Sequence, residues 1–154
     1  MLLFTILSQI PFDLLLKTAI PNDIFMLNVG ATLTVGLLSL YVIEKIKNPT
    51  LKLPLLFILI GLSIAIPMDY SFIGVLYIIA FYAFQNSKLL SSFAFVIIVL
   101  LRSYIYNNLF AIPALLALIP INLFNGKKGK NAKYLFYAFY PLHMLLIVIL
   151  TKLT

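Results

Sequence analysis

The sequence predicts an all-α membrane protein, a polytopic transmembrane helix bundle of about six membrane-spanning helices preceded by a partial N-terminal helix. Two observations predict this fold class. Hydrophobic residues make up 64% of the chain, charged residues 10%, and the mean hydropathy is +1.14, whereas soluble domains average about 45–50% apolar and about 25% charged residues. The apolar residues also gather in runs with very short connections. Neighbouring helices are therefore expected to form antiparallel hairpins within a single transmembrane domain covering residues 1–154.

The expected helices follow the apolar runs in order. The first run, residues 1–16, is broken by Ser8, Gln9, Pro11 and Asp13, so a short or half-crossing helix is expected there. Further spans are expected at residues 24–43, 53–67, 70–84, 89–106, 109–124 and 134–150. Several are shorter than the about 20 residues of a full crossing, so tilting or local thinning of the bilayer is expected.

The net charge of +7 is concentrated in connections that alternate along the chain. Eight of the eleven basic residues lie in three of them: Lys45, Lys47, Lys52, Lys88, Lys127, Lys128, Lys130 and Lys133. The positive-inside rule places these connections in the cytoplasm, and the multi-pass chain in the inner or plasma membrane. The lysines would also meet anionic lipid of the bilayer. No base-stacking residues accompany them, so nucleic-acid binding is not expected.

The composition also limits the chemistry. The chain has no cysteine, which excludes disulfides, thiolate nucleophiles and cysteine metal sites. It has one histidine and four acidic residues, too few for a conventional metal site, so no metal is expected.

The single histidine, His143, lies in the last apolar run, two residues after Pro141. It is ten positions past Lys133, which places it about 15 Å into the membrane at the rise of an α-helix. Because an imidazole at that depth is costly, it usually faces the bundle interior or a wet cavity. Two interpretations remain open: a hydrogen bond to a neighbouring helix only, or a functional role.

Polar residues from distant parts of the chain fall in the outer half of the membrane. Arg102 is fourteen positions past Lys88, about 21 Å along a helix, and Asp69 lies in an outer connection. Gln9 and Asp13 lie near the outer end of the first helix if that helix begins inside. We therefore expect Asp69 and Arg102 to lie close to the histidine, because buried charges seek partners.

Each of these polar and aromatic residues also has a purely structural interpretation. Arg102 could extend its side chain to the outer interface, and Asp69 could cap the helix that follows it. Tyr134, Tyr137 and Tyr140 are spaced three apart and form one helical stripe, which helix packing and interfacial anchoring would explain.

Four stretches of the sequence resemble one family of membrane proteins. They are LLFTILSQIPFDLLL (residues 2–16), LNVGATLTVGLLSLYVIEKIKN (27–48), MDYSFIGVLYIIAFYAF (68–84) and KYLFYAFYPLHMLLIVIL (133–150). In this order and spacing they resemble the TraX family, which is linked to conjugation and to the acetylation of pilin, and the resemblance covers essentially the whole chain. The family-pattern positions are Gln9, Pro11, Asp13, Asp69, Tyr70, Gly74, Tyr140, Pro141 and His143.

The resemblance implies a membrane acyltransferase, or part of one. An acyl-CoA, such as acetyl-CoA, would be the donor, and a pilin-like protein or another envelope component would be the acceptor. Under this interpretation His143 would be the general base, Asp69 would orient its imidazole, and Arg102 would bind a phosphate or stabilise an oxyanion. The remaining polar positions would bind substrate: Gln9, Asp13, Tyr70 and Tyr140.

The resemblance also implies a difference from the family. TraX-like proteins begin with two further helices that carry an aspartate–histidine pair, and this sequence starts in the third family helix. We therefore expect little or no acyl transfer by the 154 residues alone, because losing a general base typically costs about 10²–10⁴-fold in rate. The alternative function is a non-catalytic helical membrane protein that binds a partner or lipid. A transporter is less favoured, because no inverted repeat is visible.

Overall fold

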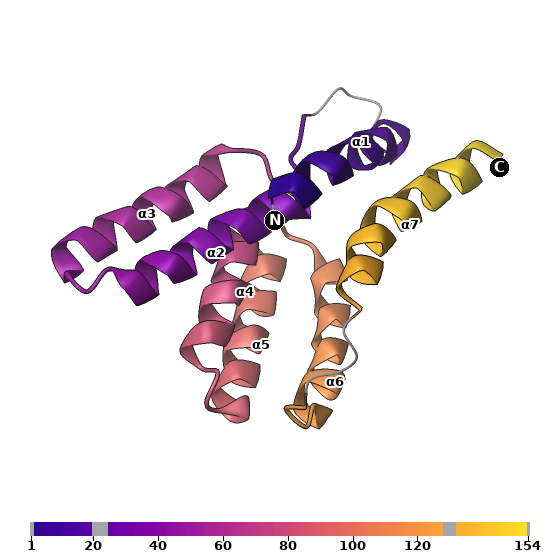
Figure 1. Ribbon diagram of the computed structural model, residues 1–154. Helices are drawn as coiled ribbons and strands as arrows, with labels where there is room; N and C mark the ends of the chain where they lie inside the picture. The colour runs from indigo at the N-terminus through magenta and orange to yellow at the C-terminus, as the bar shows by residue number, and fades with distance from the viewer. Residues whose placement is uncertain (1, 20–24, 128–131, 154) are drawn as a thin grey trace.

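The computed structural model describes residues 2–19, 25–127 and 132–153, and it confirms the all-α fold class for them (Figure 1). The elements are α1 (Leu2–Ala19), α2 (Val29–Lys45), α3 (Pro49–Ala65), α4 (Ser71–Ala83), α5 (Lys88–Ile105), the 3₁₀ helix η1 (Leu109–Ala117), α6 (Leu118–Leu123) and α7 (Lys133–Leu153). α6 continues η1 directly, so the two together occupy the sixth expected span.

The helices form three groups that extend in different directions from a common centre (Figure 1). α2 pairs with α3, and α4 pairs with α5, against which η1 and α6 also pack. α1 packs against α7. Contacts of α2 with α4 and with α1 join the groups. The expected hairpins are therefore present in α2–α3 and α4–α5, but they cross one another instead of lying parallel in a single bundle.

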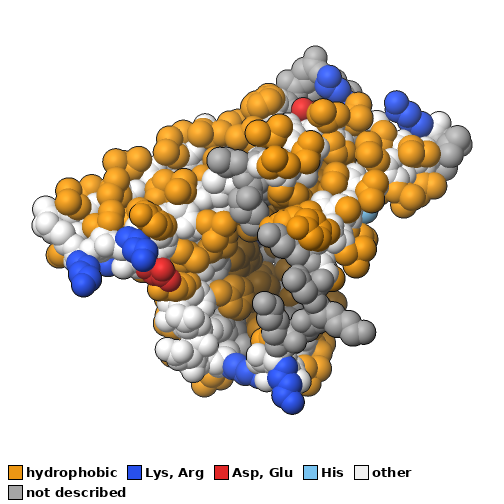
Figure 2. All heavy atoms as spheres, viewed as in Figure 1, with side chains coloured by type: hydrophobic (Ala, Val, Ile, Leu, Met, Phe, Trp, Pro, Cys, Tyr) orange, Lys and Arg blue, Asp and Glu red, His pale blue; other side chains and the backbone are white. Residues whose placement is uncertain are grey.

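Apolar surface is abundant, although few helices have the length of a full crossing. Among the described residues, α5 is the one helix that is both long and apolar enough to cross a membrane. Shorter apolar helices cover Pro49–Ala65, Ser71–Ala83, Leu109–Leu123 and Tyr137–Lys152. Hydrophobic side chains cover much of the face shown in Figure 2, and an apolar surface of this extent marks contact with a membrane or a partner. The number of crossings stays a prediction.

The second helix begins later than the sequence indicated. Residues 24–43 were expected to be helical, but Phe25 to Asn28 are not, and Ile24 lies outside the described residues. The reason is a helix cap: the side chain of Asn28 accepts a hydrogen bond from Gly30 N at 2.8 Å, so the helix starts at Val29. α1, in contrast, runs on to Ala19, beyond the expected end at residue 16.

The sixth expected span is irregular. Residues 109–124 were expected to form an ordinary membrane helix, but the first nine residues adopt a 3₁₀ helix and only six follow as α6. Pro113 lies inside η1 and Pro120 inside α6. Each proline lacks an N–H donor and clashes with the carbonyl one turn upstream, so two prolines seven positions apart disrupt an α-helix over this length.

Close packing of α2 on α4 depends on small residues. At Gly74 an added Cβ would overlap the methyl group of Thr32 and lie 2.7 Å from the Cβ of Tyr70. At Gly36 it would meet the end of the flexible Ile78 side chain, which can move aside more easily. Gly74 therefore sets how closely the two hairpins approach.

Replacing Gly74 by valine is expected to lower the free energy of unfolding by about 1–3 kcal/mol, because the added side chain has no space. Gly61→Val is the matched control, since a Cβ there meets no atom within 4 Å. Thermal unfolding of both purified variants in detergent measures the difference. Equal losses of stability in the two variants would show that the low helix propensity of valine, and not the close approach of α2 to α4, causes the destabilisation.

Candidate functional site

Three turns meet at the centre from which the helices extend, and we call them the central turns: residues 25–28, 66–70 and 106–108. Two backbone hydrogen bonds join the first two of them. Leu27 N donates to Pro67 O and Asp69 N donates to Leu27 O, both at 2.9 Å, which forms a parallel bridge between Leu27 and Met68. This bridge fixes the backbone of Asp69 relative to the start of α2.

A polar network beside the central turns ties α1 to the start of α2. Gln9 Nε2 donates to Asp13 Oδ1 at 2.7 Å and to Met26 O at 2.8 Å. Gln9 Oε1 accepts from Asn28 N at 3.1 Å and from Asn28 Nδ2 at 2.9 Å. Asn28 is fully buried, and its Nδ2 also donates to Thr5 O at 2.7 Å. The network therefore holds the first central turn in place.

A pocket of about 320 Å³ opens among the central turns. Asp69 and Tyr70 line it from the turn between α3 and α4, and Met26 and Met68 come from the two bridged turns. Arg102 and Tyr106 reach it from the end of α5, and Asn108, Phe110 and Ala111 complete it from the start of η1. Polar and apolar side chains thus share one cavity that three separate chain segments build.

Among the described residues, Arg102 and Asp69 are the charged groups that line the pocket. The guanidinium of Arg102 lies 5.1 Å from the centre of the Tyr70 ring, within cation–π range. Arg102 is half-buried, whereas Asp69 is exposed toward solvent. Partial exclusion of water nevertheless raises the pKa of Asp69 above its ordinary value, and the nearby charge of Arg102 offsets part of that rise. The two groups therefore interact at a distance.

The alternative interpretation of Asp69, that it caps the following helix, is wrong. The N-cap position of α4 is Tyr70, which makes no side-chain capping bond. The carboxylate of Asp69 is thus not used to start a helix, although a capping carboxylate would stabilise one. Its side chain instead lines the pocket.

Asp69→Asn is expected to leave stability at neutral pH unchanged or slightly raised. Folding raises the pKa of this carboxyl group, so its contribution to the stability of the protein is present below the pKa of the unfolded chain and is lost as the pH rises through the pKa of the folded chain. At neutral pH the ionised carboxylate is therefore less favourable in the folded protein than in the unfolded chain. Thermal unfolding of wild type and variant at neutral pH checks this. A clear loss of stability in the variant would show that the carboxylate is structural.

His143 and Tyr140 lie on α7, which packs against α1. The Tyr140 ring lies 5.5 Å from Phe4 and 5.5 Å from His143. Tyr140 also lies near the backbone of Val29 and near Asp69 and Tyr70. His143 is half-buried, stacks on Phe139 with 5.1 Å between ring centres, and places Nδ1 3.0 Å from Phe139 O.

The structure brings some of the sequence-predicted site residues together and separates others. Asp69, Tyr70 and Arg102 line one pocket. Gln9 and Asp13 do not line it; they belong to the network that holds the first central turn. His143 does not line the pocket either, and its ring contacts on α7 are Phe139 and Tyr140.

Sequence reasoning missed three polar residues at the centre: Asn28, Tyr106 and Asn108. An asparagine directly before an apolar run is a helix-start signal, and this signal would have found Asn28 and Asn108. Asn108 caps η1 through a bond from Phe110 N at 2.8 Å. The part of the chain that the structure describes contains no group of three or more metal-ligating His, Asp or Glu side chains.

These features define a class: an all-α protein with extensive apolar surface, in which turns between helix pairs enclose a pocket with one arginine and one aspartate. The model of the TraX protein family matches residues 1–151. The chain therefore belongs to the TraX family, which confirms the resemblance of the four sequence blocks. Comparisons with curated proteins and with solved structures return no match.

Proposed function

We propose that the protein is a membrane acyltransferase of the TraX type, or part of one, which uses an acyl-CoA such as acetyl-CoA to modify a protein or envelope acceptor. Membership of the TraX family, which is associated with acetylation of F-pilin, supports the reaction class. The observation that carries the proposal is the central pocket, in which family-pattern positions Asp69 and Tyr70 lie beside Arg102.

The chemistry needs a base and a group that stabilises negative charge. The nitrogen or oxygen of the acceptor attacks the thioester carbonyl, the carbon–sulfur bond breaks, the acceptor proton passes to the base, and the CoA thiolate takes up a proton. Arg102 suits the developing oxyanion or a donor phosphate, because a guanidinium offers several N–H donors in a fixed plane. The ring of Tyr70 contacts that guanidinium.

His143 is the proposed base, and its hydrogen bond indicates which nitrogen would act. A backbone carbonyl only accepts hydrogen bonds, so Nδ1 beside Phe139 O carries the proton in the neutral ring. Nε2 is then the basic nitrogen. Tyr140 contacts the ring of His143 and lies on the side of α7 near Asp69 and Tyr70.

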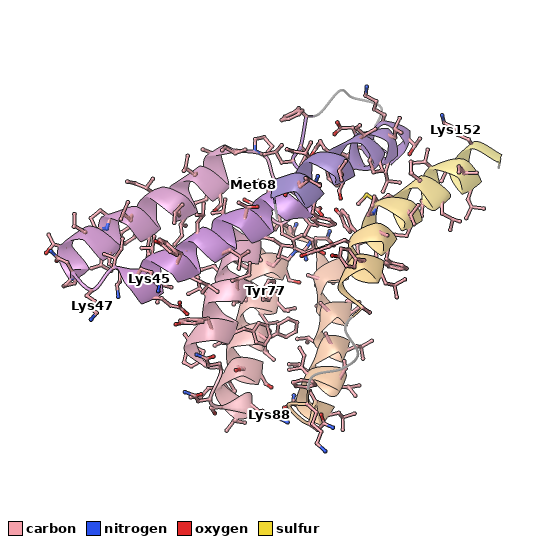
Figure 3. All side chains as sticks on the ribbon, in the orientation of Figure 1. Lys45, Lys47, Met68, Tyr77, Lys88 and Lys152 are labelled. Atoms are coloured by element: carbon pink, nitrogen blue, oxygen red, sulfur yellow. The ribbon has the colours of Figure 1, made fainter. Side chains whose placement is uncertain are left out.

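We also propose a multi-pass topology in which the lysine-bearing turns face the cytoplasm and the central turns face the opposite side. Lys45, Lys47 and Lys88 lie at the ends of the hairpins away from Met68 in Figure 3. Each hairpin thus has a basic end and a central end, which is the charge asymmetry that the positive-inside rule uses.

Labelling of single cysteines tests this topology directly, because the chain has no cysteine of its own. A cysteine in place of Lys47 or Lys88 is expected to react with an impermeant thiol reagent from the cytoplasmic side only. A cysteine in place of Asn108 is expected to react from the opposite side only. Reaction of Lys47→Cys and Asn108→Cys from the same side would contradict the proposed topology.

One observation favours the alternative, a non-catalytic membrane protein that binds a lipid or a partner. The only histidine of the chain does not line the central pocket, so the pocket offers binding groups without an adjacent imidazole base. Under this alternative, a ligand binds at Arg102 and no group is transferred.

Transfer of labelled acetyl groups tests the proposed function. The purified chain is incubated with acetyl-CoA and acceptor, alone and together with a polypeptide that carries the two helices implied by the family resemblance. We expect transfer in the combined preparation, and its loss in His143→Ala. Absence of transfer from both preparations, with the chain correctly folded, would favour the non-catalytic alternative.

A further inference from the structure

Among the described residues, neither Arg102 nor Asp69 has a hydrogen-bond or salt-bridge partner for its side chain. In the described part of the chain, the guanidinium of Arg102 has no acceptor within hydrogen-bonding distance, and its contact is the Tyr70 ring. The carboxylate of Asp69 likewise makes no hydrogen bond there, and its interaction with Arg102 is electrostatic, without direct contact. The half-buried guanidinium and the carboxylate line one cavity but form no salt bridge with each other. Both groups are therefore available to a ligand that carries an anion and a cation.

The matching ligand carries an anion and a primary ammonium a short distance apart. A phosphate suits Arg102, because guanidinium and phosphate form paired, charge-assisted hydrogen bonds. A primary ammonium suits Asp69, since its N–H groups can donate to the carboxylate. Phosphoethanolamine has both groups on a two-carbon spacer, and it is the headgroup of phosphatidylethanolamine.

The surroundings of the pocket indicate a membrane lipid as the source of this headgroup. Phe110 and Tyr106 both line the pocket, yet Phe110 is 91% exposed and Tyr106 52% exposed. The neighbouring Leu109 is 74% exposed. A headgroup in the pocket would therefore place its acyl chains against exposed apolar side chains, and tyrosines at such a position are typical of the membrane–water interface.

We propose that the central pocket binds the phosphoethanolamine headgroup of a membrane aminophospholipid, with the phosphate on Arg102 and the ammonium on Asp69. Phosphatidylglycerol and phosphatidylcholine each offer a suitable partner to Arg102 but not to Asp69. Phosphatidylglycerol would bring its phosphate near Asp69 without a compensating cation. Phosphatidylcholine has a quaternary ammonium without N–H donors, and the aromatic ring that would suit it, Tyr70, already contacts Arg102.

Competition among lipids tests the proposal. The full purified chain is mixed with equal amounts of phosphatidylethanolamine, phosphatidylcholine and phosphatidylglycerol of the same acyl chains, and the retained lipid is measured by native mass spectrometry. We expect phosphatidylethanolamine to be preferred. Arg102→Gln and Asp69→Asn should each reduce that preference about tenfold or more, because each removes a charge-assisted hydrogen bond.

Matched variants separate this site from general charge effects. Lys47→Gln and Glu44→Gln remove one charge each near the far end of the α2–α3 hairpin and should leave the preference unchanged. Arg102→Lys keeps the charge and should retain part of the preference. The assay contains no acyl-CoA, so its outcome is independent of acyl transfer, and either proposal can fail alone.

Three results would overturn the assignment. The first is an equal affinity for phosphatidylglycerol or phosphatidylcholine, which would show that the ammonium is not recognised. The second is displacement of the lipid by free phosphoethanolamine at equal concentration, which would identify a soluble ligand. The third is an unchanged preference in folded Arg102→Gln or Asp69→Asn, which would place the lipid elsewhere on the apolar surface.

Discussion

Asn28→Leu is expected to lower the free energy of unfolding by on the order of 3–5 kcal/mol. Asn28 is fully buried and makes three side-chain interactions: it donates to Thr5 O and to Gln9 Oε1, and it accepts from Gly30 N. Leucine has a similar size but no polar atom. The substitution therefore removes three hydrogen bonds inside the protein. Gln9 Oε1 keeps its bond from the backbone N of Asn28, but the buried Gly30 N loses its acceptor, and an unsatisfied buried group costs about 1–3 kcal/mol beyond the lost bonds.

Asn48→Leu is the matched control for this substitution. Asn48 caps α3 by accepting from Thr50 N at 3.0 Å, but it is exposed and water can replace the lost bond. A loss of only about 1 kcal/mol is expected there. Unfolding of both variants in detergent, followed by circular dichroism, measures the difference. Similar losses for the two variants would mean that the network around Gln9 contributes little.

Composition and charge predicted much of the architecture. Apolar runs placed α3, α4 and α5 close to their observed positions, because long apolar segments with short connections have few alternatives to helical hairpins. Counting residues from Lys88 placed Arg102 in the outer half of the membrane, and Asp69 was expected in an outer connection. The two residues do line one pocket. A constant rise per residue makes such a count informative along a helix axis.

Counting residues along the last helix could not predict which side chains surround His143. Depth along a helix says nothing about the side that a residue faces or about the helix that covers it. α7 packs on α1, and the histidine stacks on Phe139 of its own helix. The bridge between Leu27 and Met68 was also beyond prediction, because backbone atoms of two distant turns form it and no side-chain pattern encodes that pairing.

Arg102→Gln is expected to reduce acyl transfer by about 10²–10³-fold, the usual cost of removing one group that stabilises a developing oxyanion. The same change should affect stability little. In the described residues the guanidinium makes no hydrogen bond, and the contact of this half-buried group with Tyr70 is worth about 0.5–2 kcal/mol. A large fall in the transfer rate without a loss of stability would distinguish a functional arginine from one that only extends its side chain to the membrane–water interface.

The rate of acetyl transfer from labelled acetyl-CoA tests the central pocket as the functional site most directly. It is measured in the combined preparation described above for wild type, Arg102→Gln and Lys47→Gln, in equal amounts of folded protein. We predict that Lys47→Gln keeps the wild-type rate, since Lys47 lies at a hairpin end away from the pocket. For Arg102→Gln we predict a rate at least about 100-fold lower. Equal rates for Arg102→Gln and Lys47→Gln would contradict a functional role of the central pocket.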